Sequence, residues 1–90
     1  MKIKLELFGA SRDFSNKDHL EFDIKEKIEI KDFRMKIINY LDKNFEGNEK
    51  FKKIVQSSAF CSEDNNIIND NYKIIKDQKI GIIPPIGGGW

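Results

Sequence analysis

The feature that most constrains the fold of this chain is a change in the spacing of its apolar residues near Ile30. Before that point, residues 2–8 and 20–24 alternate apolar with charged side chains, as strands with one buried face do. From Ile30 to Leu41 the apolar residues recur at steps of three and four, as in a helix with one buried side. The sequence therefore predicts a hairpin of two strands, followed by a helix that ends near Lys43.

Other parts of this first half are predicted to lie in loops or in solvent. The small, polar residues 9–13 indicate a turn or loop, and residues 15–18 lie near the tip of the hairpin. On the predicted helix, Arg34 and Lys36 fall mainly on the solvated side.

The second half predicts a shorter helix and three more strands. The helix covers residues 49–56, with Phe51, Ile54 and Val55 facing inward. Residues 72–74 are predicted as one turn of helix. The strands are predicted at residues 58–62, 67–68 and 79–83, with a polar turn at 63–66.

The predicted order, β-β-α-(α)-β-β-β, defines an α+β class. A helix between a hairpin and later strands packs across one face of a mixed sheet, which gives a roll. If the last strand pairs with the first, it does so in parallel and lies centrally. Ninety residues suit one small domain, predicted at residues 1–83, with residues 84–90 as an extended tail.

Composition excludes several classes of function. Sixteen basic residues stand against fifteen acidic ones, so the net charge of +1 argues against a nucleic-acid binder. The single cysteine rules out an internal disulfide and a multi-cysteine zinc site, and we expect no metal. The charged N-terminus resembles neither a signal peptide nor a membrane span. We therefore expect a soluble domain of the reducing cytoplasm.

The C-terminal segment Pro84-Pro85-Ile86-Gly87-Gly88-Gly89-Trp90 carries the functional signal. The prolines end the strand in an extended direction, and the glycines add no bulk. From Pro84 to Gly89 such a tail reaches up to about 20 Å, far enough to enter a channel in another protein. The reactive group at the end of the glycines is a carboxylate. Reaction with ATP activates it as an acyl-adenylate, which a sulfur nucleophile converts to a thiocarboxylate. A frayed terminus without function is the alternative.

Residues 81–89, GIIPPIGGG, resemble the strand-PP-x-x-GG terminus of the MoaD/ThiS ubiquitin-like sulfur carriers. The resemblance is closest to MoaD, the small subunit of molybdopterin synthase. Residues 7–13, LFGASRD, resemble the start of that family, and the turn at residues 77–79 before the last strand fits as well. The resemblance spans nearly the whole chain, although its specificity lies mostly in the last ten residues.

This resemblance implies a β-grasp fold and a mechanism. A MoeB-type enzyme adenylates the terminal glycine with ATP, sulfur is loaded as a thiocarboxylate, and the tail enters a MoaE-type large subunit that delivers sulfur to a pterin precursor. The chain itself binds no cofactor, and the other catalytic groups come from the large subunit.

The site residues follow position by position from the same resemblance. Gly88 and Gly89 match the diglycine, with Gly89 as the acyl carrier. Pro84 and Pro85 match the proline pair that positions Gly89, and Ile86 and Gly87 enter the partner with them. Phe8 and Arg12 match the opening motif. For Phe8, a place in the core is the interpretation preferred over a contact with a partner.

Trp90 departs from the family pattern, because such carriers usually end at the second glycine. While Trp90 remains, Gly89 has no free carboxylate and cannot be adenylated. We interpret the chain as a precursor from which a peptidase removes Trp90. A carrier of different chemistry and a lineage without carrier function are the alternatives.

Two other hypotheses about function remain open. One is a sulfur carrier for thiazole, tRNA thiolation or another sulfur metabolite, although the proline pair favours molybdopterin. The other is a non-catalytic ubiquitin-like interaction module with an inert tail. Cys61 is interpreted as a small core hydrophobe, His19 as solvated surface, and residues 50–53 as solvated lysines around one core Phe.

Overall fold

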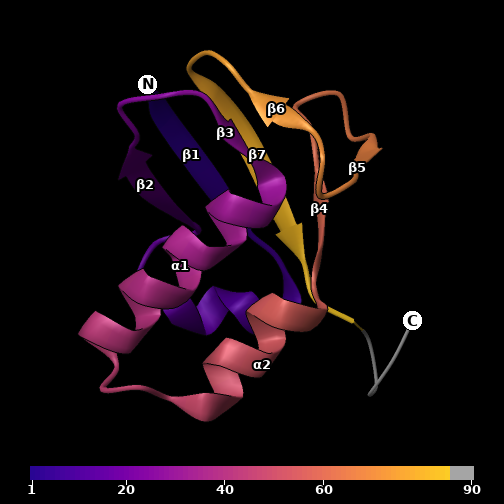
Figure 1. Cartoon of the computed structure of the whole chain (residues 1–90). Coiled ribbons are helices and arrows are strands. Elements are labelled where there is room, and N and C mark those ends of the chain that lie inside the picture. The colour runs from indigo at the N-terminus through magenta and orange to yellow at the C-terminus, as the bar shows by residue number, and fades with distance from the viewer. Residues whose placement is uncertain (86–90) are drawn as a thin grey trace.

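The computed structural model describes residues 1–85, which form a five-stranded mixed sheet with two α-helices against one face, and a small two-stranded sheet (Figure 1). The elements in chain order are β1 (Lys2–Leu7), the 3₁₀ helix η1 (Gly9–Phe14), β2 (His19–Asp23), β3 (Ile28–Glu29), α1 (Ile30–Asn44), α2 (Glu49–Ser57), β4 (Ala59–Cys61), β5 (Ile67–Ile68), β6 (Lys73–Ile74) and β7 (Gln78–Ile83).

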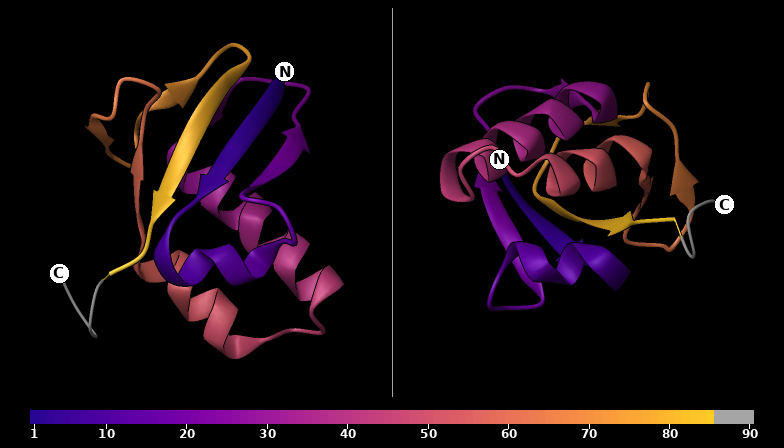
Figure 2. Two further views of the ribbon diagram at one scale, coloured as in Figure 1. Left: turned by 180° about the vertical axis from the view of Figure 1, so that it is seen from behind. Right: turned by 90° about the horizontal axis from the view of Figure 1, so that it is seen from below.

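The main sheet has the strand order β2-β1-β7-β4-β5. The hairpin pairs β1 with β2 antiparallel, and β7 lies parallel to β1, with Leu5 opposite Ile80. On its other side β7 pairs antiparallel with β4. Seen from behind, β1 and β7 run side by side, with α1 on the far side of the sheet (Figure 2). The last strand does pair with the first, and it is parallel to it and central, as expected for that pairing.

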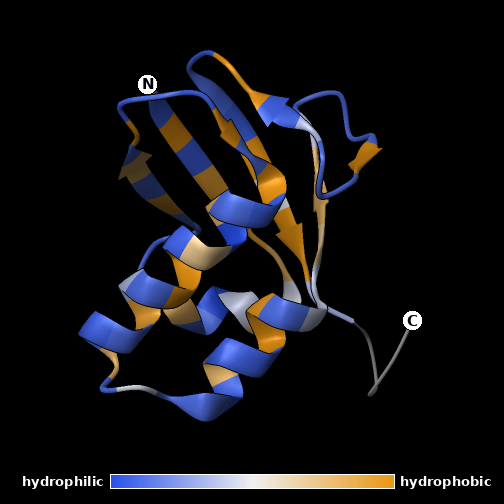
Figure 3. Ribbon diagram, viewed as in Figure 1, coloured by the Kyte–Doolittle hydropathy of each residue, from blue (hydrophilic) through white to orange (hydrophobic). Residues whose placement is uncertain are grey.

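The core lies between the sheet and α1. Alternation along β1 buries Ile3, Leu5 and Leu7, each at most 3% exposed, and Figure 3 shows this strand in alternating orange and blue. From α1, the side chains at helical spacing that meet them are Ile30, Phe33, Ile37, Ile38 and Leu41. The predicted hairpin and the helix over residues 30–43 are confirmed.

The shorter helix α2 begins where Asn48 caps it, since the side-chain oxygen of Asn48 accepts a hydrogen bond of 3.1 Å from the Phe51 backbone N–H. Val55 is fully buried, as predicted, whereas Phe51 is half-buried. The Phe51 ring lies 5.0 Å from those of Phe14 and Phe45 between centroids, so α2 is held by an aromatic cluster.

The prediction that Arg34 falls on the solvated side is wrong. Its guanidinium donates hydrogen bonds of 2.7 Å to the backbone oxygens of Val55 and Ser58, and it pairs with Asp70 at 2.9 Å. It also lies over the Phe60 ring, 4.8 Å from the centroid. Arg34 therefore ties α1 to the end of α2, because its long side chain reaches carbonyls that helix spacing does not reveal.

The loop predicted at residues 9–13 is instead the helix η1. The Ser11 hydroxyl accepts a hydrogen bond from the Phe8 N–H at 3.0 Å and donates one to the Phe8 carbonyl at 2.6 Å. Phe14, 1% exposed, anchors the end of this helix in the core. A buried serine bonded to both backbone groups of one residue stabilises a turn that small residues alone do not predict.

The helical turn predicted at residues 72–74 is also wrong. Lys73 and Ile74 form β6, which pairs antiparallel with β3 in a separate two-stranded sheet. Ile74 is fully buried opposite Ile28, so a contact between distant residues decides the local structure. Lys73 and Ile74 are too few for apolar spacing to distinguish a strand from a turn of helix.

The hairpin, the helix across one face and the central parallel last strand are the arrangement of a β-grasp roll. The α+β class predicted from the order of elements is confirmed. Within residues 1–85, neither helix combines the length and the apolar character that crossing a membrane requires.

Candidate partner-binding face at the root of the tail

The tail begins from the central strand of the sheet. β7 lies between β1 and β4 and ends at Ile83. Pro84, the next residue, is buried, and Pro85 is half-buried. A Cβ added to Gly9 would lie 3.8 Å from Cδ of Pro84, so this proline sits beside the start of η1. The root of the tail is thus fixed against the body of the protein.

The remaining predicted tail residues lie outside the described part of the chain. These are Ile86, Gly87, Gly88, Gly89 and Trp90. Their assigned roles as acyl carrier, partner contact and processing site therefore stay predictions.

Phe8 lies on the face of the sheet opposite α1, and its predicted place in the core is wrong. Its side chain is 41% exposed. A Cβ added to Gly81 would come within 2.9 Å of Cε2 of Phe8 and 2.6 Å of Sγ of Cys61. Gly81 therefore leaves a space in the sheet surface into which both side chains pack.

Register extends this cluster along the sheet. Ala59 is opposite Ile83, and Cys61 is opposite both Gly81 and Ile67, so all of these residues share the outer face. Ile67 is 66% exposed. We call this surface the apolar outer face; it comprises Phe8, Ala59, Cys61, Ile67, Gly81 and Ile83.

The other half of the same sheet surface is charged. On β1 and β2 the outward positions are Lys2, Lys4, Glu6, His19, Glu21 and Asp23. At the boundary, Lys79 pairs with Glu6 at 3.3 Å. The apolar outer face is therefore bordered by charge on one side and by the root of the tail at its end, a composition typical of a protein-binding patch.

Cys61 is buried, as predicted, although it packs on the outer face rather than beneath the sheet. Removal from solvent raises the pKa of its thiol, and the nearby Glu6 carboxylate acts in the same direction. A thiol that stays protonated at neutral pH is a poor nucleophile, so Cys61 serves this face as a small apolar group.

The other candidates from the sequence form no site with this face. His19 Nδ1 lies 2.9 Å from Asp18, and this hydrogen bond lowers the pKa of the Asp18 carboxyl. Across residues 1–85, no group of three or more His, Cys, Asp or Glu side chains is placed to hold a metal ion. Arg12 is exposed on η1, and Lys50 and Lys53 are exposed on α2.

Sequence reasoning missed Ala59, Ile67 and Ile83 as members of a surface. The signal was present at Gly81, since a glycine inside a strand marks a close approach by other groups. Which groups approach it depends on pairing between distant strands, which no local pattern gives.

Fold and surface together define a ubiquitin-like β-grasp protein with an apolar face beside the root of its tail. No protein-family model matches the sequence, and no curated protein matches it. Among solved structures, it is similar to one described as a molybdopterin converting factor, subunit 1, from Pyrococcus furiosus. The TM-score is 0.68 at 18% identity, over 94% of this chain and 98% of the other.

It is also similar to SAMP1 from Haloferax volcanii, with a TM-score of 0.67 at 11% identity, over 99% of this chain and 100% of the other. At these identities the likeness shows the fold, and the ubiquitin-like β-grasp fold implied by the sequence resemblance is confirmed.

Proposed function

We propose that this protein is a sulfur carrier that uses Gly89 as the reactive group, once Trp90 has been removed. The observation that carries the proposal is the position of the tail: the proline pair follows the central strand directly, beside the apolar outer face, and is followed in sequence by Gly87-Gly88-Gly89. A partner bound to that face lies within reach of the glycines. The sequence resemblance and the shared fold of the two solved structures support the same role.

The chemistry proceeds in three steps. Hydrolysis of the peptide bond between Gly89 and Trp90 frees the Gly89 carboxylate. A carboxylate oxygen then attacks the α-phosphorus of ATP and pyrophosphate leaves, which gives an acyl-adenylate. Sulfur at the oxidation level of sulfide attacks the acyl carbon and AMP leaves, so that the thiocarboxylate retains one oxygen of the original carboxylate.

The partners follow from this chemistry. The activating step requires a MoeB-type enzyme, which binds ATP, and sulfur delivery requires a MoaE-type large subunit. Both partners must reach the same terminal glycine. We infer that they bind the apolar outer face in turn, with Phe8 and Ile83 buried in each complex, and that their binding is mutually exclusive.

The specific role we propose is that of the small subunit of molybdopterin synthase in molybdenum cofactor biosynthesis. The adjacent prolines favour this role over a carrier for thiazole. The likeness to a protein described as a molybdopterin converting factor subunit points the same way. The alternative from another class is an interaction module whose tail takes no part in chemistry.

The test uses two forms of the chain, one ending at Trp90 and one at Gly89, each incubated with the adenylating enzyme, ATP and sulfide. We expect only the form ending at Gly89 to release pyrophosphate and to gain about 16 mass units as oxygen is replaced by sulfur. A form ending at Gly88 is the matched control for tail length. Reaction of the full-length form alone, or no gain of mass in either form, contradicts the proposal.

A further inference from the structure

The strand β2 (His19–Asp23) forms an open edge of the main sheet. The strand order places it at the end opposite β5, and in the described chain it pairs only with β1 (Figure 1). Its five residues include no proline, glycine or bulge that would block pairing with another strand. An open edge of this length is a template for an added strand.

The register identifies which backbone groups are free. Met1 and Ile24 exchange hydrogen bonds of 2.6 and 2.8 Å, and the Leu7 N–H donates to the Asp18 carbonyl at 2.9 Å. Because bonding pairs alternate along antiparallel strands, Phe22 bonds to β1, while the N–H and C=O groups of Glu21 and Asp23 point away from it.

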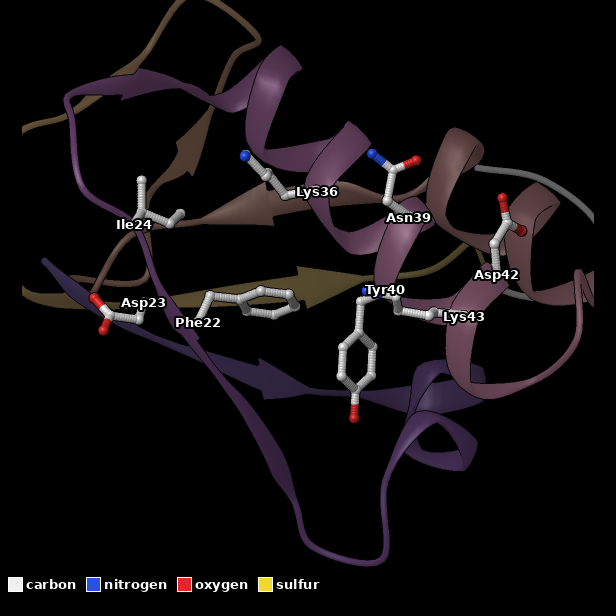
Figure 4. A pocket seen from close by; sticks show the side chains of 8 residues that line it. All are labelled: Phe22, Asp23, Ile24, Lys36, Asn39, Tyr40, Asp42 and Lys43. Atoms are coloured by element: carbon white, nitrogen blue, oxygen red, sulfur yellow. The ribbon is translucent and has the colours of Figure 1, made fainter.

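A groove runs beside this edge, between β2 and α1. Its volume is about 530 Å³, and its apolar lining includes Phe22, Ile24 and Tyr40, with Lys36 and Lys43 on the helix side (Figure 4). The Phe22 and Tyr40 rings meet edge to face, 5.6 Å between centroids. A second hollow of about 490 Å³ shares Tyr40 and continues past Leu20 to Phe45. The groove thus follows β2 along most of its length.

The outward side chains of β2 are acidic. Glu21 is 67% exposed and lies 3.5 Å from His19 Nε2, and in the described part of the chain no lysine or arginine pairs with Glu21 or Asp23. In the register with β1, these two carboxylates lie opposite Lys4 and Lys2. The strand already present on one side of β2 therefore alternates lysine with apolar residues.

We propose that the free edge of β2 binds an extended segment of a partner protein in which lysine or arginine alternates with apolar residues. The backbone of that segment hydrogen-bonds with Glu21 and Asp23. Its basic side chains lie beside the two carboxylates, and its apolar side chains enter the groove at Phe22 and Tyr40. A second copy pairing through its own β2 would bring acidic strands together, which opposes self-association there.

This surface is separate from the one used in the proposed function. β1 and β7 lie between β2 and β4, so the apolar outer face and the tail stay accessible when β2 is paired. The carrier could hold one protein at β2 while another acts on Gly89. A negative result in the sulfur-loading experiment leaves this inference standing, and the reverse also holds.

The experiment titrates the full chain with an acetylated, amidated peptide of alternating lysine and valine, about seven residues long so that it spans β2. Amide shifts should concentrate at residues 19–24 and Tyr40, and hydrogen exchange should slow at the N–H groups of Glu21 and Asp23. A peptide of alternating glutamate and valine should bind about tenfold more weakly, because two cross-strand charge pairs become repulsive.

Three variants separate backbone pairing from charge. Glu21→Ala keeps the N–H and should weaken binding about threefold, whereas Glu21→Pro removes it and should abolish binding. The proline removes no bond to β1, because that N–H points away. If Glu21→Pro does not fold, the doubly reversed variant Glu21→Lys, Asp23→Lys still decides, since it should prefer the glutamate peptide.

Three results would overturn the inference. The first is equal affinity for the two peptides. The second is shifts confined to Phe8 and Ile83 on the apolar outer face. The third is a dimer formed through β2 without peptide, seen by sedimentation and abolished by Glu21→Pro.

Discussion

The two halves of the exposed sheet surface have the same backbone pattern and opposite chemistry. On β1 and β2, every second residue is charged or is His19. Lys2, Lys4, Glu21 and Asp23 are exposed, whereas Glu6 and His19 are half-buried. On β4 and β7, the equivalent positions hold Cys61, Gly81 and Ile83, and Phe8 packs beside them. Alternation decides which residues face outward. The side chains at those positions decide which partners the surface suits: apolar ones on β4 and β7, basic ones at the charged edge of β2.

The largest expected effect is a loss of binding affinity on substitution in the apolar half of the sheet surface. Phe8→Glu should weaken the proposed complex with an adenylating enzyme by at least about 30-fold, because a carboxylate would be buried without a partner. The free energy of unfolding should change by only about 1 kcal/mol, since Phe8 is 41% exposed and lies outside the core. Calorimetric titration and urea denaturation measure the two quantities.

The matched control for that comparison is Lys4→Gln on the charged half, which should alter affinity by less than about threefold. Equal losses for Phe8→Glu and Lys4→Gln would mean that the two halves are not functionally distinct.

A second prediction concerns the space above Gly81. Gly81→Ala should lower the free energy of unfolding by about 1–2 kcal/mol, because its Cβ would lie 2.6 Å from Sγ of Cys61. Adding Cys61→Ala should recover part of this loss by removing the sulfur. A double-mutant cycle in urea measures the coupling. Additive effects would show that the close contact is relieved in another way.

The third prediction uses the raised pKa of Cys61. As the pH rises above the ordinary thiol pKa of about 8.5, the unfolded chain loses this proton before the folded protein does. Stability from this group is therefore fully present at lower pH and is lost through the alkaline range. The difference in unfolding free energy between the protein and Cys61→Ala should narrow or reverse there. Parallel pH profiles would contradict the assignment.

The smallest effect is expected at the boundary between the halves. Lys79 and Glu6 form an ion pair at 3.3 Å in which both side chains keep contact with solvent. Their coupling free energy should be at most about 0.5 kcal/mol and should vanish in high salt. A double-mutant cycle with Lys79→Met and Glu6→Gln measures it, and a coupling several times larger would mean that this pair helps to order the sheet surface.

The sequence was sufficient to predict the sheet and the main helix, because their apolar residues follow unambiguous periods. The alternation also indicates an outward Phe8, because Ile3, Leu5 and Leu7 point inward and the next residue faces the other side. The preference for aromatic residues in cores led to the wrong assignment. Strand alternation was the stronger guide, since it reflects backbone geometry rather than an average over proteins.

What the sequence could not give depends on contacts between distant residues. The bonds from Arg34 to the end of α2 and the pairing of β3 with β6 each join segments more than twenty residues apart. The tail motif of the candidate site could be identified from the sequence. The apolar outer face beside it could not, because it forms only when β1, β4, β5 and β7 pair.

The placement of β7 has a mechanical consequence. If the tail is drawn out of a partner's channel after each transfer, the load passes through Pro84 into a strand bonded on both sides, parallel to β1 and antiparallel to β4. Tension then acts along the strand, and the two ladders resist it by sliding together instead of peeling apart one bond at a time. The protein should therefore withstand repeated pulling on the chain that follows Pro84.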